Sequence, residues 1–176
     1  METAMNETMI FAISVCVSNP NMERDASPNQ HRMPETATVV MLINGRQIEK
    51  TGNSAGGWMH STCDAVFAAA RAAGVQLNGM HMHAVEIRHI VQNPGNPKTA
   101  DAKPYDEAVV TVKNGPTEYA LPIEIPDAVS ESPINRKALA IAQSCAQGIR
   151  YIINSVKKKE ITPHGSPRTA LEWGTP

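Results

Sequence analysis

The chain has 176 residues, enough for one domain with a single hydrophobic core. Its Lys and Arg side chains nearly balance its Asp and Glu side chains, and the formal net charge of −1 gives no overall attraction to nucleic acid or to an anionic membrane. Three cysteines form no paired framework, which predicts a reducing, cytoplasmic location.

The first residues of the chain predict a disordered start followed by a strand. Residues 1–8 carry no periodic pattern, so we expect a disordered N-terminus. The longest apolar run, Met9 to Val17, is about half as long as a bilayer span. Within it, apolar and small or polar residues alternate, which is typical of a strand with one buried face. A polar, proline-bearing loop is expected from Asn19 to Thr36.

A hairpin and a helix are predicted next. Val39–Ile43 indicates a strand, Asn44-Gly45 is a strong hairpin signal, and Gln47–Thr51 is the returning strand. The glycine-rich stretch Gly52–Gly57 then leads into a helix. In that helix we expect Ser61 and Asp64 to form a capping box and Gly74 to end the helix. The apolar residues at helical spacing are Cys63, Val66, Phe67, Ala70 and Ala73.

The second half follows the same plan. We expect a strand at Met82–Val91 and a loop at Asn93–Lys103. A strand at Ala108–Lys113, a hairpin turn at Asn114-Gly115 and a returning strand at Thr117–Ile125 follow. Ser132-Pro133 predicts the start of a second helix, whose apolar stripe runs from Leu139 to Val156. Lys157–Lys159 closes that helix at the negative end of its dipole, and residues 160–176 are predicted to be a flexible tail.

Two pairs of segments repeat each other in the same order. Ile13–Pro20 matches Ile87–Pro94 at a shift of about 74 residues, and Val39–Gly45 matches Val109–Gly115 at a shift of about 70. We therefore predict an α+β fold in one duplicated domain spanning residues 9–157. It would contain two pseudo-twofold-related units of three strands and a helix (βββα), at about 9–75 and 80–157, with antiparallel sheets covered by two helices.

Several motifs, taken together, resemble a known family. The first are an apolar strand at Ala37–Gly45, a Gly-Asn turn at Thr51–Asn53 and an alanine-rich helix that opens with Asp-Ala at Asp64–Ala69. Gly74 and Leu77 follow this helix, and the second helix closes with Ile-Asn at Ile152–Asn154. Over residues 10–157 this order resembles the C-terminal regulatory (dimerisation) domain of α-isopropylmalate synthases and citramalate synthases. The chain departs from the family pattern by an insertion without proline after Asn53, and it is too short to contain the family's catalytic barrel.

The resemblance implies a stand-alone regulatory domain without catalytic residues or cofactor. It implies a homodimer or higher homo-oligomer, a branched-chain amino acid or similar carboxylate as ligand, and a separate enzyme as a candidate partner. Glycine-rich turns that open a helix present backbone amides to a carboxylate or phosphate. The predicted ligand-binding residues are Asn53, Ser54, Ala55, Gly56, Gly57, His60, Ser61 and Asp127, and the last is matched only through the family. The alternative is a turn whose glycines serve local geometry alone.

Other candidate chemistry is weaker. His81 and His83 share a strand face, with His89 further along it, which makes them weak candidates for zinc or copper ligands. Surface histidines are the favoured interpretation, because no acidic or cysteine partner has suitable spacing. Cys63 and Cys145 occupy similar places in the two helices and are expected to be buried small side chains.

Three function classes follow from these observations. The leading hypothesis is a non-catalytic, dimerising regulatory domain that binds a small carboxylate metabolite. The alternative is a sequestering protein that binds an anionic, nucleotide-type ligand in the same turn. A small metal- or thiol-dependent enzyme is the third. No nucleic-acid or membrane partner is expected.

Overall fold

The computed structural model describes residues 7–18, 35–91, 103–127 and 132–161, with side chains of the last helix described as far as residue 157. The predictions for residues 1–6, for most of the two proline-bearing loops and for the tail from residue 162 fall outside these ranges.

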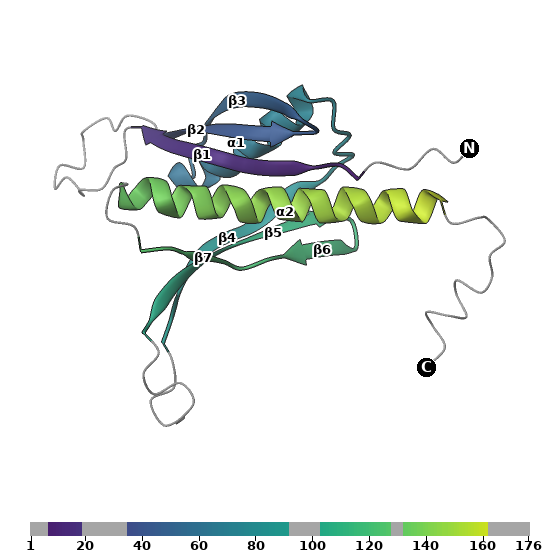
Figure 1. Ribbon diagram of the computed structural model, residues 1–176. Coiled ribbons are helices and arrows are strands. Elements are labelled where there is room, and N and C mark those ends of the chain that lie inside the picture. Colours follow the sequence, from purple (N-terminus) through teal and green to yellow (C-terminus); the bar gives the residue numbers. More distant parts are fainter. Residues whose placement is uncertain (1–6, 19–34, 92–102, 128–131, 162–176) are drawn as a thin grey trace, which may run out of the picture.

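The described residues form two antiparallel sheets and two helices, an α+β architecture (Figure 1). The first sheet has the order β1-β2-β3, and its strands and following helix are β1 Ile10–Ser18, β2 Thr36–Ile43, β3 Arg46–Asn53 and α1 Trp58–Ala72. In the second sheet β5 pairs with three strands, and its elements are β4 His81–Ile90, β5 Tyr105–Asn114, β6 Thr117–Ala120, β7 Ile123–Ile125 and α2 Pro133–Ile161.

Helix α2 lies across the middle of the molecule, between the first sheet and strands β6 and β7 (Figure 1). It runs along β1 of the first sheet and also packs on β5, β6 and β7 and on α1. From Ala138 to Ile149 most of its side chains are buried, on more than one face. A helix enclosed in this way has no wide polar face, which explains the small and aliphatic residues of this stretch.

The hairpins predicted from the two Asn-Gly pairs are confirmed. Asn44 and Gly45 have φ angles of 50° and 82° and connect β2 to β3. In the second hairpin Gly115 has a φ of 60°, and β5 and β6 pair directly beside it. In the first turn both Asn44 and Gly45 are left-handed, whereas Asn114 is the last residue of β5 and only Gly115 is left-handed in the second turn.

The predicted capping box at Ser61 and Asp64 is wrong. Helix α1 begins at Trp58, so Ser61 lies inside its first turn and is fully buried. The Ser61 hydroxyl instead joins β2 to the end of β3, because it donates to the carbonyl oxygen of Glu35 at 2.6 Å and accepts from the Ser54 N–H at 2.8 Å. The predicted stop at Gly74 is confirmed, since the helix ends at Ala72 and Gly74 has a φ of 86°.

The single returning strand predicted over Thr117–Ile125 is also wrong, because the chain leaves the sheet at Leu121-Pro122. Strand β6 pairs with one end of β5 and β7 with the other. Ser144 of α2 fills the interruption: its hydroxyl donates to the Leu121 carbonyl at 2.7 Å and accepts from the Val110 N–H at 2.8 Å. A helix side chain thereby satisfies two groups that the sheet leaves unpaired.

The first strand of each sheet carries a bulge. In β1 the register shifts between Ala12 and Ser14, and in β4 it shifts between Met82 and Ala84. The bulges therefore relate Ser14 to Ala84, 70 positions on. The 74-residue sequence match of Ile13–Pro20 does not coincide with these strand positions.

The bulge in β4 overturns the prediction that His89 shares a face with His81. Alternation along a strand restarts after a bulge, because the extra residue has no partner opposite it. Counted by partners on β5, His89 lies on the face of Val85 and Ile87, opposite to that of His81.

The core joins both sheets and both helices. Cys63 and Cys145 are buried in it, as predicted, while Cys16 is exposed. Thr8 is only 4% exposed, so the prediction that residues 1–8 are loose is wrong for Thr8. Among the helices in the described residues, none combines the length and the apolar character that crossing a bilayer requires.

Candidate functional site

The turn predicted to bind ligand uses its backbone donors internally. The Ser54 N–H donates to Ser61 Oγ at 2.8 Å, the Gly56 N–H to Ser54 Oγ at 3.1 Å, and the Gly57 N–H to the Ser54 carbonyl oxygen at 3.2 Å. Three of the amides expected to receive a carboxylate thus already have acceptors.

Each glycine of this turn also has a local structural role. A Cβ at Gly52 would lie 1.9 Å from the Ser61 carbonyl oxygen, so β3 and α1 approach each other closely there. A Cβ at Gly56 would lie 2.8 Å from Cγ of His60, and Gly57 has a φ of 99° at the start of α1. These contacts fit the alternative in which the glycines serve local geometry.

The remaining residues of the predicted site are spread apart. Asn53 and Ala55 are exposed at the end of β3 and in the turn, whereas Ser61 is fully buried. Asp127 is exposed after β7 in the other sheet, and no hydrogen bond or ion pair joins it to the turn within the described residues. The turn stays a prediction for ligand binding.

The histidines of β4 do not converge. The rings of His81 and His83 lie edge to face with centroids 6.4 Å apart, and Nδ1 of His81 is 3.3 Å from the Gly79 carbonyl oxygen. His89 instead pairs with Asp106 at 2.7 Å on the neighbouring strand. In the described part of the chain no three His, Cys, Asp or Glu side chains form a group that could hold a metal ion.

A cavity of about 360 Å³ lies elsewhere, where the two halves of the chain meet. Its walls come from both hairpin turns, from the end of α1 and the segment after it, and from the last part of α2. The volume falls in the range of known small-molecule sites, about 300–1,000 Å³.

Within the described residues, the cavity is lined by side-chain amides, one hydroxyl and one cation together with aliphatic groups. The polar lining residues are Thr8, Asn44, Gln76, Asn78, Asn114 and Lys157. The apolar ones are Ala73, Val75, Met80, Ile153 and Val156, with Gly74 between them. Both hairpin asparagines therefore reach one cavity, although their sequence positions were explained by turn geometry alone.

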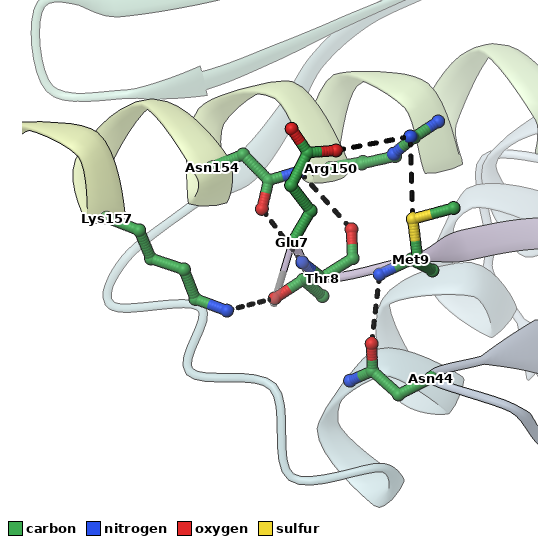
Figure 2. A network of polar contacts seen from close by, with 7 residues as sticks. All are labelled: Glu7, Thr8, Met9, Asn44, Arg150, Asn154 and Lys157. Carbon is green, nitrogen blue, oxygen red and sulfur yellow. Dashed lines mark hydrogen bonds and ion pairs between the residues drawn. The ribbon is translucent and has the colours of Figure 1, made fainter. Parts of the chain in front are cut away.

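Thr8 of the short N-terminal segment Glu7–Met9 lines this cavity, and Figure 2 shows the contacts that hold the segment in place. Asn154 brackets Thr8, because its Oδ1 accepts from the Thr8 N–H at 2.9 Å and its Nδ2 donates to the Thr8 carbonyl at 3.3 Å. Asn44 also holds Met9 on both sides: its Oδ1 accepts from the Met9 N–H and its backbone N–H donates to the Met9 carbonyl, both at 2.9 Å. Asn154 and Asn44 thus hold the segment between the first hairpin and α2.

Lys157 is the one charged side chain among the described residues that line the cavity. Its Nζ donates to Oγ1 of Thr8 at 2.5 Å, and no carboxylate of the described residues pairs with it (Figure 2). Arg150, one turn before Asn154, is directed to Glu7 at 3.7 Å and to the ring of Phe11 instead. Within the described part of the chain, Thr8 Oγ1 is thus the hydrogen-bond partner of the Lys157 ammonium beside the cavity.

The C-terminal end of α1 brings a partial negative charge to the same cavity. Ala73 and Gly74 line the cavity, and this end of the helix carries the negative end of the helix dipole. In the described residues no backbone N–H donates to the Ala72 carbonyl, since the Ala73, Gly74 and Val75 amides bond to Ala69, Ala70 and Arg71. A cavity with a cation on one wall and a helix C-terminus on another suits a zwitterion.

Sequence reasoning missed this cavity because its lining residues are far apart along the chain. The only signal present was the recurrence of Asn-Gly, which the turns explain, together with a lysine at a helix end, which the helix dipole explains. Comparisons with protein-family models and with curated proteins give no match to this chain. The family resemblance stays a prediction from the sequence.

Proposed function

We propose that this protein is a non-catalytic regulatory domain that dimerises and binds a small carboxylate metabolite in the cavity beside Lys157. The observation that carries the proposal is a cavity of about 360 Å³ whose described lining holds a single charged side chain, the Lys157 ammonium. The other polar groups are amides and a hydroxyl, which donate and accept hydrogen bonds without titrating near neutral pH.

A branched-chain amino acid is the ligand that this lining fits best. Its carboxylate would accept from Lys157, and its ammonium would lie at the end of α1, where the helix dipole favours a cation. Its aliphatic side chain would pack on the Met80 and Ile153 side of the cavity, which is apolar. This is also the ligand class that the resemblance to the isopropylmalate synthase regulatory domain implies.

A nucleotide-type ligand fits the same lining less well. A phosphate ester carries more charge than one lysine neutralises, and nucleobases are usually stacked on aromatic or Arg side chains. Among the described lining residues there is no aromatic side chain and no arginine.

The duplication predicted from the sequence supports a site between two related units. Each sheet begins with a bulged strand, which is followed by a hairpin with a two-residue turn, Asn44-Gly45 in the first sheet and Gly115-Pro116 in the second, and each unit ends in a helix. We propose that these are two copies of one βββα unit, with β7 an addition to the second. Ligand between the units would regulate a separate enzyme only if it binds one conformation or assembly state more tightly than another.

The free thiols fit the reducing cytoplasm in which we place this function.

Isothermal titration calorimetry with L-leucine, L-isoleucine and L-valine tests the proposal. We expect at least one of them to bind the wild-type protein, and Lys157→Met to weaken that binding by about ten- to a hundredfold, the usual worth of a hydrogen bond to a charged group. Lys50→Met is the matched control, because Lys50 is exposed on β3 and does not line the cavity. Absence of heat with all three amino acids at millimolar concentration, or equal affinities for the two variants, would contradict the proposal.

A further inference from the structure

Strand β4 is an open sheet edge. It pairs with β5 on one side only, and no backbone hydrogen bond in the described part of the chain reaches its other side. Helix α2 packs along β1, the corresponding strand of the first sheet, whereas neither described helix packs along the length of β4. In Figure 1 the ends of β4 and β5 project beyond the other elements. Free edges of this kind pair readily with another strand.

The side chains of this edge alternate in character. Val85 and Ile87 are partly buried against the core, and Glu86 and Arg88 point to the opposite face with side chains 53% and 48% exposed. Glu86 and Arg88 lie two positions apart and form an ion pair at 2.6 Å. A strand with one acid and one base on the same face is charge-complementary to an antiparallel copy of itself.

We propose that a second copy of this chain pairs with β4, antiparallel and about a twofold axis through Ile87. The stretch Ala84–Ile90 of one chain then lies beside the same stretch of its partner. In this register Glu86 of each chain faces Arg88 of the other, and Ile87 faces Ile87 across the axis. The two four-stranded sheets become one continuous sheet, and the interface is isologous, as in most dimers.

Charge selects this register over its neighbours. Strands that pair within one sheet keep each side chain on its own face, so the register can change only in steps that conserve faces. A twofold axis at Glu86 would set two glutamates opposite each other, and an axis at Arg88 would set two arginines opposite each other. Like charges directly across strands are destabilising, and opposite charges contribute about 0.2–1 kcal/mol per pair. The bulge before Ala84 ends the regular stretch on one side.

This inference rests on the self-association proposed above and not on the ligand. Sedimentation velocity on Glu86→Arg, on Arg88→Glu and on their equimolar mixture tests it. Wild-type protein is expected at twice the 19.0 kDa of one chain. Each single reversal sets like charges across the axis at two symmetric places and should weaken dimerisation about tenfold or more. Mixing the two variants should restore association, because each then meets its complement.

The outcomes are distinguishable. Glu49→Arg on β3, the edge strand of the other sheet, makes the same charge change away from β4 and should dimerise like wild type. Wild-type protein that stays monomeric would overturn the dimer itself. A wild-type dimer that both single reversals leave intact, or whose reversed variants do not associate when mixed, would overturn β4 as the interface.

Discussion

Gly52 shows how a single residue sets the distance between two elements. It lies next to the last residue of β3 and against the start of α1, where a Cβ would lie 1.9 Å from the Ser61 carbonyl oxygen and 2.8 Å from the Ala65 nitrogen. Both neighbours are backbone atoms, which cannot move without moving the helix. The close approach lets Ser61 reach both Glu35 and Ser54.

Gly52→Ala is therefore expected to lower the free energy of unfolding by about 3 kcal/mol, at the upper end of overpacking costs. Urea denaturation gives the value, and an unchanged m-value shows that compactness is preserved. Gly45→Ala is the control: its Cβ would meet no atom within 4 Å, and only the positive φ of 82° adds a cost, about 1 kcal/mol. Equal losses in the two variants would contradict the steric account.

The buried thiols form a second residue-scale feature. Burial raises the pKa of Cys145 well above its ordinary value, and the neighbouring Cys63 adds to the increase by hydrogen bonding and charge, with a smaller contribution from Asp64. The raised pKa keeps Cys145 protonated in the folded protein, while the thiol of the unfolded chain ionises above about pH 8.5. Cys145 therefore stabilises the fold fully below that pH and loses this contribution as the pH rises.

This linkage gives a pH prediction. Between pH 8.5 and 10 the free energy of unfolding of the wild-type protein should fall more steeply than that of Cys145→Ala, by up to about 1.4 kcal/mol per pH unit for one proton. Native-state labelling at pH 8 should modify the exposed Cys16 first. If the free energies of unfolding of the two proteins change with pH in parallel, the pKa of Cys145 is the same in the folded and unfolded states, which contradicts the prediction.

At the scale of elements, helix side chains complete the sheets. Ser144 replaces the backbone partner that the interruption between β6 and β7 removes from Val110 and Leu121. Ser61 does similar work between Glu35 and Ser54 beside the first sheet. Each helix is thus fixed to its sheet by a buried hydroxyl as well as by apolar packing, which restricts sliding along the sheet.

Ser144→Ala should cost about 1–3 kcal/mol, because the Val110 N–H and the Leu121 carbonyl would be buried without partners. Ser155→Ala, in the same helix and only partly buried, should change stability by less than about 0.5 kcal/mol. Amide exchange at Val110 should also become faster in Ser144→Ala alone. Slow exchange there after the substitution would mean that another acceptor protects Val110.

The elements were predictable where their cause is local. The Asn-Gly pairs predicted both hairpins because Asn44, Gly45 and Gly115 adopt left-handed backbone at low cost, although Asn114 itself ends β5 and the second turn is Gly115-Pro116. Helical spacing of Cys63, Val66, Phe67 and Ala70 identified a buried face, and Gly74 marked the end of α1. The expected cap at Ser61 failed because a nearby strand and turn, which the sequence pattern does not reveal, engage its hydroxyl.

At the scale of the whole molecule, the α+β class and the two helices were predictable from the sequence, whereas the cavity was not. Thr8, Asn78 and Lys157 meet only after the N-terminal segment, the linker after α1 and the end of α2 have packed together. Spacing rules describe neighbours along one element, and these residues share none. The exposed glycine-rich turn attracted the prediction because its signal is local.

A structure from crystals grown with saturating L-leucine tests most directly the claim that the cavity beside Lys157 binds a branched-chain amino acid. We predict leucine in the cavity, with its carboxylate within hydrogen-bond reach of Lys157 Nζ and its isobutyl group against Ile153. Leucine bound instead at the turn formed by Gly52–His60, or a cavity that holds only solvent at saturating ligand, would contradict the account.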